Sequence, residues 1–246
     1  MHELDLVARF IPAGSRILEI GAGVGWQAKE LQNRGFNVEA IDLADGTYAH
    51  LQIHHVQSYD GKTVPFPDDS FDVVFSSNVL EHIPQVEVFQ SEIHRVLRPG
   101  GIAIHGLPTP TWRLWTSFMH YPHIALRLVS KFIRRPTDIG PGVQGAKFDG
   151  KYHSFLSRMC RALYAPRHGE SGSVATELYY FSRRRWRNLF ARTGWNIVDM
   201  ISNRLLYSGY LLGGSLLPFF LRRWASKCIG GSVTFYVLRP VSRSKI

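Results

Sequence analysis

The sequence predicts an α/β protein with a doubly wound sheet and helices on both faces. Three observations support this fold class. An apolar segment near 16–21 runs directly into a turn with three glycines, strand-like and helix-like segments alternate as far as residue 106, and the loops between them are short. Parallel strands joined through helices require right-handed crossovers, and their ligands bind outside the carboxyl ends of the strands. A site at that edge of the sheet is therefore expected.

The predicted elements follow from hydrophobic periodicity. Strands are expected near 16–21, 37–42, 53–57, 72–77, 101–106, 195–201 and 232–239, and helices near 25–34, 46–51, 86–97 and 182–193. The chain has 246 residues, of which 45% are apolar and 20% charged. This composition is typical of a globular protein, and the length suits one domain with insertions.

The glycine turn indicates a nucleotide ligand. Gly21, Gly23 and Gly25 stand at alternate positions, where glycine allows positive φ and close approach of a ligand to the backbone. A dinucleotide fingerprint requires glycine where this chain has Trp26, and no P-loop lysine follows the turn. The spacing therefore disfavours hydride-transfer cofactors and P-loop nucleotides. A purely structural turn is the alternative.

Further motifs continue in order along the chain. Asp42 ends the second apolar strand, Asp60 lies five residues before Pro65, a longer motif spans 64–83, and 92–101 closes the set. With the glycine turn, these motifs resemble those of the class I S-adenosylmethionine-dependent methyltransferases, in the subfamily that methylates small molecules, lipids and quinones. The resemblance covers residues 1–107 well. It implies a Rossmann-like, seven-stranded, mostly parallel sheet with an antiparallel terminal strand and helical insertions.

The resemblance also implies the cofactor, S-adenosyl-L-methionine, and residues that bind it. Asp42 is expected to accept the ribose hydroxyls, and Asp60 to contact the adenine amino group. By itself, Asp42 would equally suit a strand-end cap, and the loop at Asp60 a plain turn. The predicted cofactor site comprises Glu19, Gly21, Gly23, Gly25, Asp42, Asp60, Gly61 and Ser77.

Charge divides the chain into two unlike parts. Residues 1–105 hold 7 Lys/Arg and 14 Asp/Glu, a net charge of −7, whereas residues 106–246 hold 22 and 5, a net charge of +17. Because the second part differs most from the minimal fold, we expect it to recognise the substrate. Its basic excess favours anionic partners such as phosphorylated substrates, acidic lipid headgroups or nucleic acid.

Two insertions distinguish the predicted single domain at 1–246. The cofactor-binding half at 1–107 is followed by an insertion at 108–181 over the substrate side, and the C-terminal part at 182–246 contains an apolar insertion at 203–224. A helix at 124–135 has an apolar stripe with a basic flank, which suits an anionic membrane or simple packing on the domain. The uncharged run at 205–221 contains glycines and a proline, so a membrane span is not expected. Shallow membrane insertion, a lid over a lipid-like substrate, a homodimer interface and a buried hairpin remain alternatives.

The candidate catalytic residues are His168, His105 and Glu177. Methyl transfer requires an aligned nucleophile in a dry site and, for some acceptors, a general base, for which histidine is suited near neutral pH. His105 ends the fifth predicted strand, while His168 and Glu177 lie in the large insertion. Each could equally be a structural residue. Glu81 and His82, which follow the fourth predicted strand, are as well explained by a solvated pair or a helix cap.

The expected acceptor is a small-molecule or lipid-linked compound, such as a glycan intermediate, quinone or phospholipid. RNA methylation is an alternative, but nucleic acid is less favoured because the motifs for base amino-group and ring-carbon methylation are missing. Another alternative is a non-catalytic scaffold protein that docks on membranes. Cys160 and Cys228 have no metal-binding spacing, so no metal is expected. Without a recognisable secretory signal, we expect a cytoplasmic protein, peripheral at the membrane where the insertions contact it.

Overall fold

The computed structural model describes residues 2–43, 51–133, 167–170, 172–173, 175–207 and 218–241. Its strands are β1 (Arg16–Ile20), β2 (Asn37–Leu43), β3 (Gln57–Tyr59), β4 (Phe71–Ser77), β5 (Leu97–Pro108), β6 (Trp195–Ser202) and β7 (Val233–Pro240). They form one sheet in the order β3-β2-β1-β4-β5-β7-β6. Strands β1 to β5 pair in parallel, and β7 runs antiparallel between β5 and β6. The predicted fold class is therefore confirmed.

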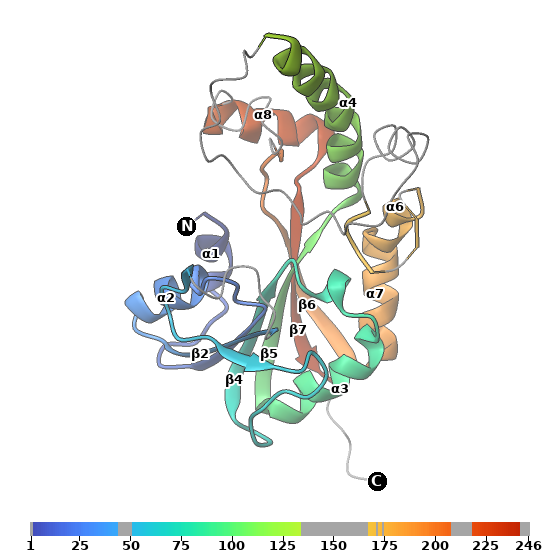
Figure 1. Ribbon diagram of the computed structural model, residues 1–246. Coiled ribbons are helices and arrows are strands. Elements are labelled where there is room, and N and C mark those ends of the chain that lie inside the picture. Colours follow the sequence, from blue (N-terminus) through green and yellow to red (C-terminus); the bar gives the residue numbers. More distant parts are fainter. Residues whose placement is uncertain are drawn as a thin grey trace.

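Helices cover both faces of this sheet (Figure 1). The helices around it are α1 (His2–Ala8), α2 (Trp26–Asn33), α3 (Val86–Val96) and α7 (Arg183–Arg192). One apolar core packs the sheet against α3 and α7, and the other packs it against α1 and α2. Buried side chains from both ends of the chain meet in these cores, which hold the carboxyl ends of the parallel strands at one edge.

The third strand lies later in the sequence than predicted. The expected segment was 53–57, but β3 comprises Gln57–Tyr59 and pairs with the end of β2. The residues before it cover the glycine turn instead, because Ile53 donates its N–H to the carbonyl of Val24 at 2.9 Å. The expected helix at 46–51 lies almost wholly outside the described residues.

Two long helices extend beyond the carboxyl ends of the strands. Helix α4 (Pro110–Ile133) follows β5 directly, and α8 (Phe219–Ile229), which the sequence analysis did not predict, precedes β7. They lie next to each other in Figure 1, and Thr111 Oγ1 donates to the carbonyl of Ile229 at 2.9 Å. Of the short elements, η2 (Leu80–His82) contacts β5 and α6 (Glu177–Tyr180) contacts α4. The predicted stripe at 124–135 falls mostly on side chains outside the described ones.

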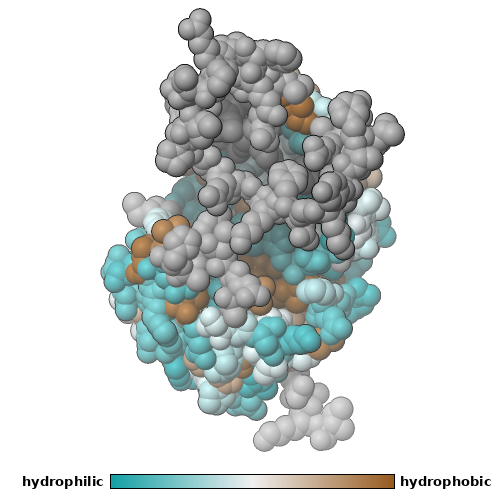
Figure 2. Space-filling model, in the orientation of Figure 1, coloured by the Kyte–Doolittle hydropathy of each residue, from teal (hydrophilic) through white to brown (hydrophobic). Residues whose placement is uncertain are grey.

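The part of the molecule built on the sheet and helix α8 expose different kinds of side chain. The lower part of the molecule, built on the sheet, is mainly hydrophilic, with scattered hydrophobic patches (Figure 2). On α8, by contrast, Phe220 and Trp224 are 67% and 65% exposed. None of the described helices combines the length and apolar character needed to cross a bilayer.

Candidate active site

The glycine turn connects β1 to α2 and requires glycine at three positions. Gly21, Gly23 and Gly25 have φ values of 74°, 55° and 79°, which disfavour any residue with a Cβ. A Cβ on Gly21 would overlap the side chain of Val79, and one on Gly25 would lie 2.7 Å from Cβ of His54. At Gly23 no described atom would lie within 4 Å of a Cβ. The turn is thus packed on two sides and leaves open space at Gly23 for a ligand.

Glu19 places a buried carboxyl group beside this turn. Its exposure is 1%, and no hydrogen-bond partner for Oε2 is present in the described part of the chain. Burial raises the pKa of Glu19 to about 8; the Ala28 N–H lowers that pKa and the Asp42 charge raises it. Because a nearby cation favours the ionised form, this carboxyl group suits a positively charged ligand. S-adenosylmethionine, with its sulfonium and ammonium groups, fits both the charge and the open space.

Asp42 binds the glycine turn directly. Its Oδ2 accepts the Gly23 N–H at 2.6 Å, and its Oδ1 accepts the Leu43 N–H at 2.7 Å. The pairing of β1 with β2 brings the ends of the two strands together. Asp42 therefore shapes the turn from the end of β2, and its binding of the ribose stays a prediction.

Asp60 and Gly61 form a turn at the end of β3. Asp60 Oδ1 accepts the N–H groups of Lys62 at 2.8 Å and Thr63 at 2.7 Å, and these bonds lower the pKa of Asp60. A Cβ on Gly61 would lie 2.8 Å from the side chain of Leu43, which places this turn next to the end of β2. The hydrogen bonds of Asp60 are thus those of a plain turn, and its contact with adenine stays a prediction.

Ser77 ends β4 at the same edge of the sheet. The next residue, Asn78, has a φ of 56° and donates its backbone N–H to the carbonyl of Gly106 at 2.8 Å. The chain then passes Val79, which contacts Gly21, and enters η2. The predicted cofactor residues at the ends of β1, β2 and β4 are therefore brought together.

His105 lies inside the core, which does not fit its predicted role as a general base. Its ring is 0% exposed, is hydrogen-bonded through Nδ1 to Ser76 Oγ at 2.8 Å, and stacks on Phe190 of α7. Burial lowers the pKa of His105 to about 3, so the ring is neutral near pH 7. The alternation of side chains along β5 turns this histidine under α7 and away from the edge of the sheet, and we assign it a structural role.

Glu177 holds the segment that carries His168. Its Oε1 accepts the backbone N–H groups of His168 at 2.7 Å and Gly169 at 2.8 Å. Its Oε2 lies 2.9 Å from Nε of Arg113, and both side chains are almost fully buried. This arrangement makes Glu177 a positioning residue, because Oε1 binds two backbone N–H groups and Oε2 pairs with Arg113.

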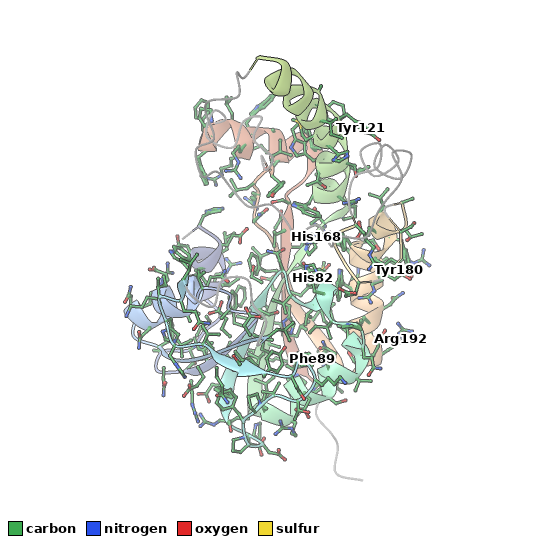
Figure 3. The ribbon with its side chains drawn as sticks, viewed as in Figure 1. His82, Phe89, Tyr121, His168, Tyr180 and Arg192 are labelled. Carbon is green, nitrogen blue, oxygen red and sulfur yellow. The ribbon has the colours of Figure 1, made fainter. Side chains whose placement is uncertain are left out.

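His168 lies beside Glu81 and His82, and Figure 3 shows the two histidines at the end of the sheet, below α4. The ring centroid of His168 is 4.7 Å from that of His82 and 4.5 Å from that of Trp112. The Glu81 side chain is only 1% exposed, so this residue is not the solvated group that the sequence suggested. Desolvation lowers the pKa of His82. The adjacent Glu81 and His82 were visible in the sequence, but their proximity to His168, 86 residues beyond His82, was not.

A hollow lies on the surface of the basic C-terminal part of the chain. It has a volume of about 510 Å³ and is lined by Ser202, Arg204, Phe220, Arg223, Trp224, Ser226 and Lys227. Aromatic and cationic side chains thus share one surface of α8. Residues 208–217 of the predicted apolar insertion lie outside the described ones.

Comparison with known proteins is consistent with this geometry. A family model described as a methyltransferase domain matches residues 18–105. The biotin biosynthesis bifunctional protein BioHC of Cellvibrio japonicus is 32% identical over 142 residues, which are 54% of this chain and 27% of that protein. The ubiquinone biosynthesis O-methyltransferase of Paramagnetospirillum magneticum is 32% identical over 111 residues, 42% of this chain and 44% of that protein. The chain thus matches less than half the length of these relatives.

A solved structure shares the fold across the whole chain. The S-adenosylmethionine-dependent methyltransferase from Mesorhizobium loti has a TM-score of 0.56 and 16% identity, with 97% of this chain and 98% of that chain covered. The matched domain contains the glycine turn, the end of β2 and η2, which form the geometry described above. On these grounds, residues 18–105 form a methyltransferase domain, and the chain has the fold of the S-adenosylmethionine-dependent methyltransferases.

Proposed function

We propose that this protein transfers a methyl group from S-adenosylmethionine to a hydroxyl oxygen of a small-molecule or lipid-linked acceptor. The observation that carries the proposal is the contact between Gly21 and Val79. It places the glycine turn against Val79, which lies two residues before Glu81 and three before His82, so a cofactor held at Gly23 and Glu19 would face the Glu81–His168 region.

Aromatic side chains favour an apolar or ring-containing acceptor. The Trp112 ring lies 4.5 Å from His168, 6.0 Å from Phe181 and 5.7 Å from Tyr207, measured between centroids. Aromatic rings supply apolar contact area in a fixed geometry, and a polar group among them orients a substrate. One relative is named for ubiquinone O-methylation, which agrees with a hydroxyl on an apolar ring as acceptor.

The surface of α8 favours a lipid-linked acceptor. Phe220 and Trp224 are exposed on the helix that also carries Arg223 and Lys227. Exposed aromatic and cationic side chains suit the interface of an anionic bilayer. We therefore propose that α8 docks on an anionic membrane and brings the active site to its acceptor. A homodimer through this surface is the competing explanation.

The chain's own residues have simple tasks in this reaction. The bound cofactor supplies an activated methyl group on a sulfonium. Glu19 and the turn would hold the cationic end of that ligand, and the aromatic side chains around Trp112 exclude water, while the His168 region orients the acceptor hydroxyl, whose proton passes to water. The new oxygen–carbon bond would replace the carbon–sulfur bond of the cofactor.

The test combines cofactor binding with turnover. Calorimetric titration with S-adenosylmethionine and S-adenosylhomocysteine would be performed on wild type, Gly23→Arg, Asp42→Ala and Asp42→Asn. Asp42→Asn is the matched variant, because an amide oxygen still accepts the Gly23 N–H. Transfer of a labelled methyl group would then be measured with phenols, isoprenoid quinols and phospholipids, with and without anionic vesicles, and with RNA.

Binding by wild type, loss in Gly23→Arg and labelling of a hydroxyl-bearing acceptor are the expected results. Labelling of RNA alone would replace the proposal with RNA methylation. Failure of wild type to bind either cofactor form would overturn it in favour of a scaffold.

A further inference from the structure

The carboxylate of Glu81 is buried, and the described residues do not compensate it with a hydrogen bond. Its side chain is 1% exposed, and neither carboxylate oxygen has a hydrogen-bond partner among the described residues. Burying an ionised carboxylate without a partner is strongly unfavourable, and buried charges in proteins are normally paired or bound to a metal. Glu81 therefore requires a partner in the folded protein.

Two imidazoles converge on this carboxylate. Oε1 of Glu81 lies 3.8 Å from Nε2 of His168 and 3.9 Å from Nε2 of His82. One ligand atom from each of these three residues lies within 4.8 Å of the others. Both contacts exceed hydrogen-bond length, so direct bonding does not satisfy the carboxylate.

The distances suit atoms arranged around a shared ion. With metal–ligand bonds of about 2.0–2.1 Å, tetrahedral ligand atoms are separated by about 3.3 Å. Side-chain rotations that shorten the observed separations by about 0.5–1.5 Å would complete the set. Two neutral imidazoles and one carboxylate form a donor set typical of divalent transition metals, with a position left for water or substrate.

Backbone contacts hold the three ligands in place. The Glu170 N–H donates to the carbonyl of Glu81 at 3.0 Å, which ties the His168 segment to η2. Glu177 fixes the same segment through the N–H groups of His168 and Gly169. Such supporting contacts orient metal ligands in known sites. These backbone contacts therefore favour a preformed metal site over an accidental cluster of surface side chains.

We propose that Glu81, His82 and His168 bind a divalent transition-metal ion of the Zn²⁺ type. The ion neutralises the buried carboxylate and accounts for the convergence of the two rings. Cysteine spacing predicted no metal, whereas the three residues of this site come from two segments that lie far apart in the chain.

The role of the ion in catalysis rests on the proposed function. A hydroxyl bound at the open position would become more acidic, because the ion would stabilise the oxyanion that remains once its proton has passed to water. The bond from this oxygen to the methyl carbon would replace the carbon–sulfur bond, whose electron pair would leave with S-adenosylhomocysteine.

The experiment measures metal binding separately from cofactor binding. Chelator-treated full-length protein would be titrated with Zn²⁺ by calorimetry and with Co²⁺ by visible absorption, which reports coordination geometry. The variants are Glu81→Gln, which keeps the shape of the side chain, and the half-exposed His168→Gln. His55→Gln, at an exposed histidine, is the matched control. Calorimetry with S-adenosylhomocysteine checks that each variant remains folded.

We expect one Zn²⁺ per wild-type chain, a tetrahedral Co²⁺ spectrum, and affinity at least about tenfold weaker in both ligand variants and unchanged in His55→Gln. Equal Zn²⁺ affinity in wild type and either ligand variant would overturn the metal site, as would no stoichiometric binding by wild type. Metal binding without cofactor binding would instead overturn the proposed function and leave the metal site standing.

Discussion

Alanine substitutions at Gly14 and Gly23 separate backbone strain from ligand binding. Both glycines have positive φ, 74° and 55°, and a Cβ on either would meet no described atom within 4 Å. Alanine at each position should therefore lower the free energy of unfolding by a similar amount, about 1–2 kcal/mol, from left-handed backbone strain alone. Only Gly23 lies in the turn that we assign to the cofactor.

The expected difference is in affinity for S-adenosylhomocysteine. A methyl group on Gly23 fills the space that the cofactor would occupy, so Gly23→Ala should bind at least about tenfold more weakly, a loss of about 1.4 kcal/mol. Gly14→Ala should bind as wild type. Gly25→Ala should be less stable than either, by about a further 1–3 kcal/mol, because its Cβ would lie 2.7 Å from Cβ of His54 and 3.3 Å from that residue's backbone N and O.

Urea denaturation gives the stabilities, and calorimetry on the folded proteins gives the affinities. The reasoning would be refuted if Gly23→Ala bound the ligand as tightly as Gly14→Ala, because the open space at Gly23 would then not be the cofactor's. Equal stability of Gly25→Ala and Gly23→Ala would contradict the packing argument.

Three further predictions follow from the site and its surroundings. Glu177→Ala should lower the free energy of unfolding, measured by urea denaturation, by about 3–5 kcal/mol, because Arg113 loses its buried partner and two N–H groups lose their acceptor. A variant that is stable but inactive would point to direct catalysis by Glu177 instead. The pKa of Glu19 is raised from 4.5 to about 8, so the folded protein holds a proton that the unfolded chain releases. The free energy of unfolding should therefore fall as pH rises from 4.5 to 8, by up to about 1.4 kcal/mol per pH unit. Glu19→Gln should remove this slope in denaturation series across that range, and an unchanged slope would contradict the assignment. Phe220→Ser with Trp224→Ser should weaken sedimentation with anionic vesicles while leaving S-adenosylhomocysteine affinity unchanged, whereas unchanged sedimentation with a shifted molecular mass would favour the dimer.

Local patterns predicted most of the sheet and the cofactor turn. Alternating apolar segments identified β1, β2, β4, β6 and β7 within two residues, because burial on a sheet selects apolar side chains along the chain. The third strand was misplaced because 51–56 covers the glycine turn, a tertiary contact that resembles a strand in composition. Helix α8 was missed because its first residues were assigned to the apolar insertion at 203–224, although the helix begins directly after Pro218.

The catalytic candidates show the limits of sequence reasoning. His105 was chosen for its place at the end of a strand, but which face of the sheet its ring occupies depends on pairing register and on the position of α7. Glu177 was chosen as a further catalytic candidate, but its carboxylate accepts from the backbone N–H groups of His168 and Gly169, which composition does not reveal.

The sequence by itself determined the fold class, the glycine turn and the acidic residues at the ends of the first two strands. Each of these depends on backbone conformation and burial over a few neighbouring residues, which local residue types encode directly. Only the tertiary structure decided that Glu81, His82 and His168 share one site, that His105 is enclosed in the core, and that α4 and α8 lie together beyond the sheet. Such contacts join segments far apart in the chain, and their geometry exists only after the strands have paired and the helices have packed.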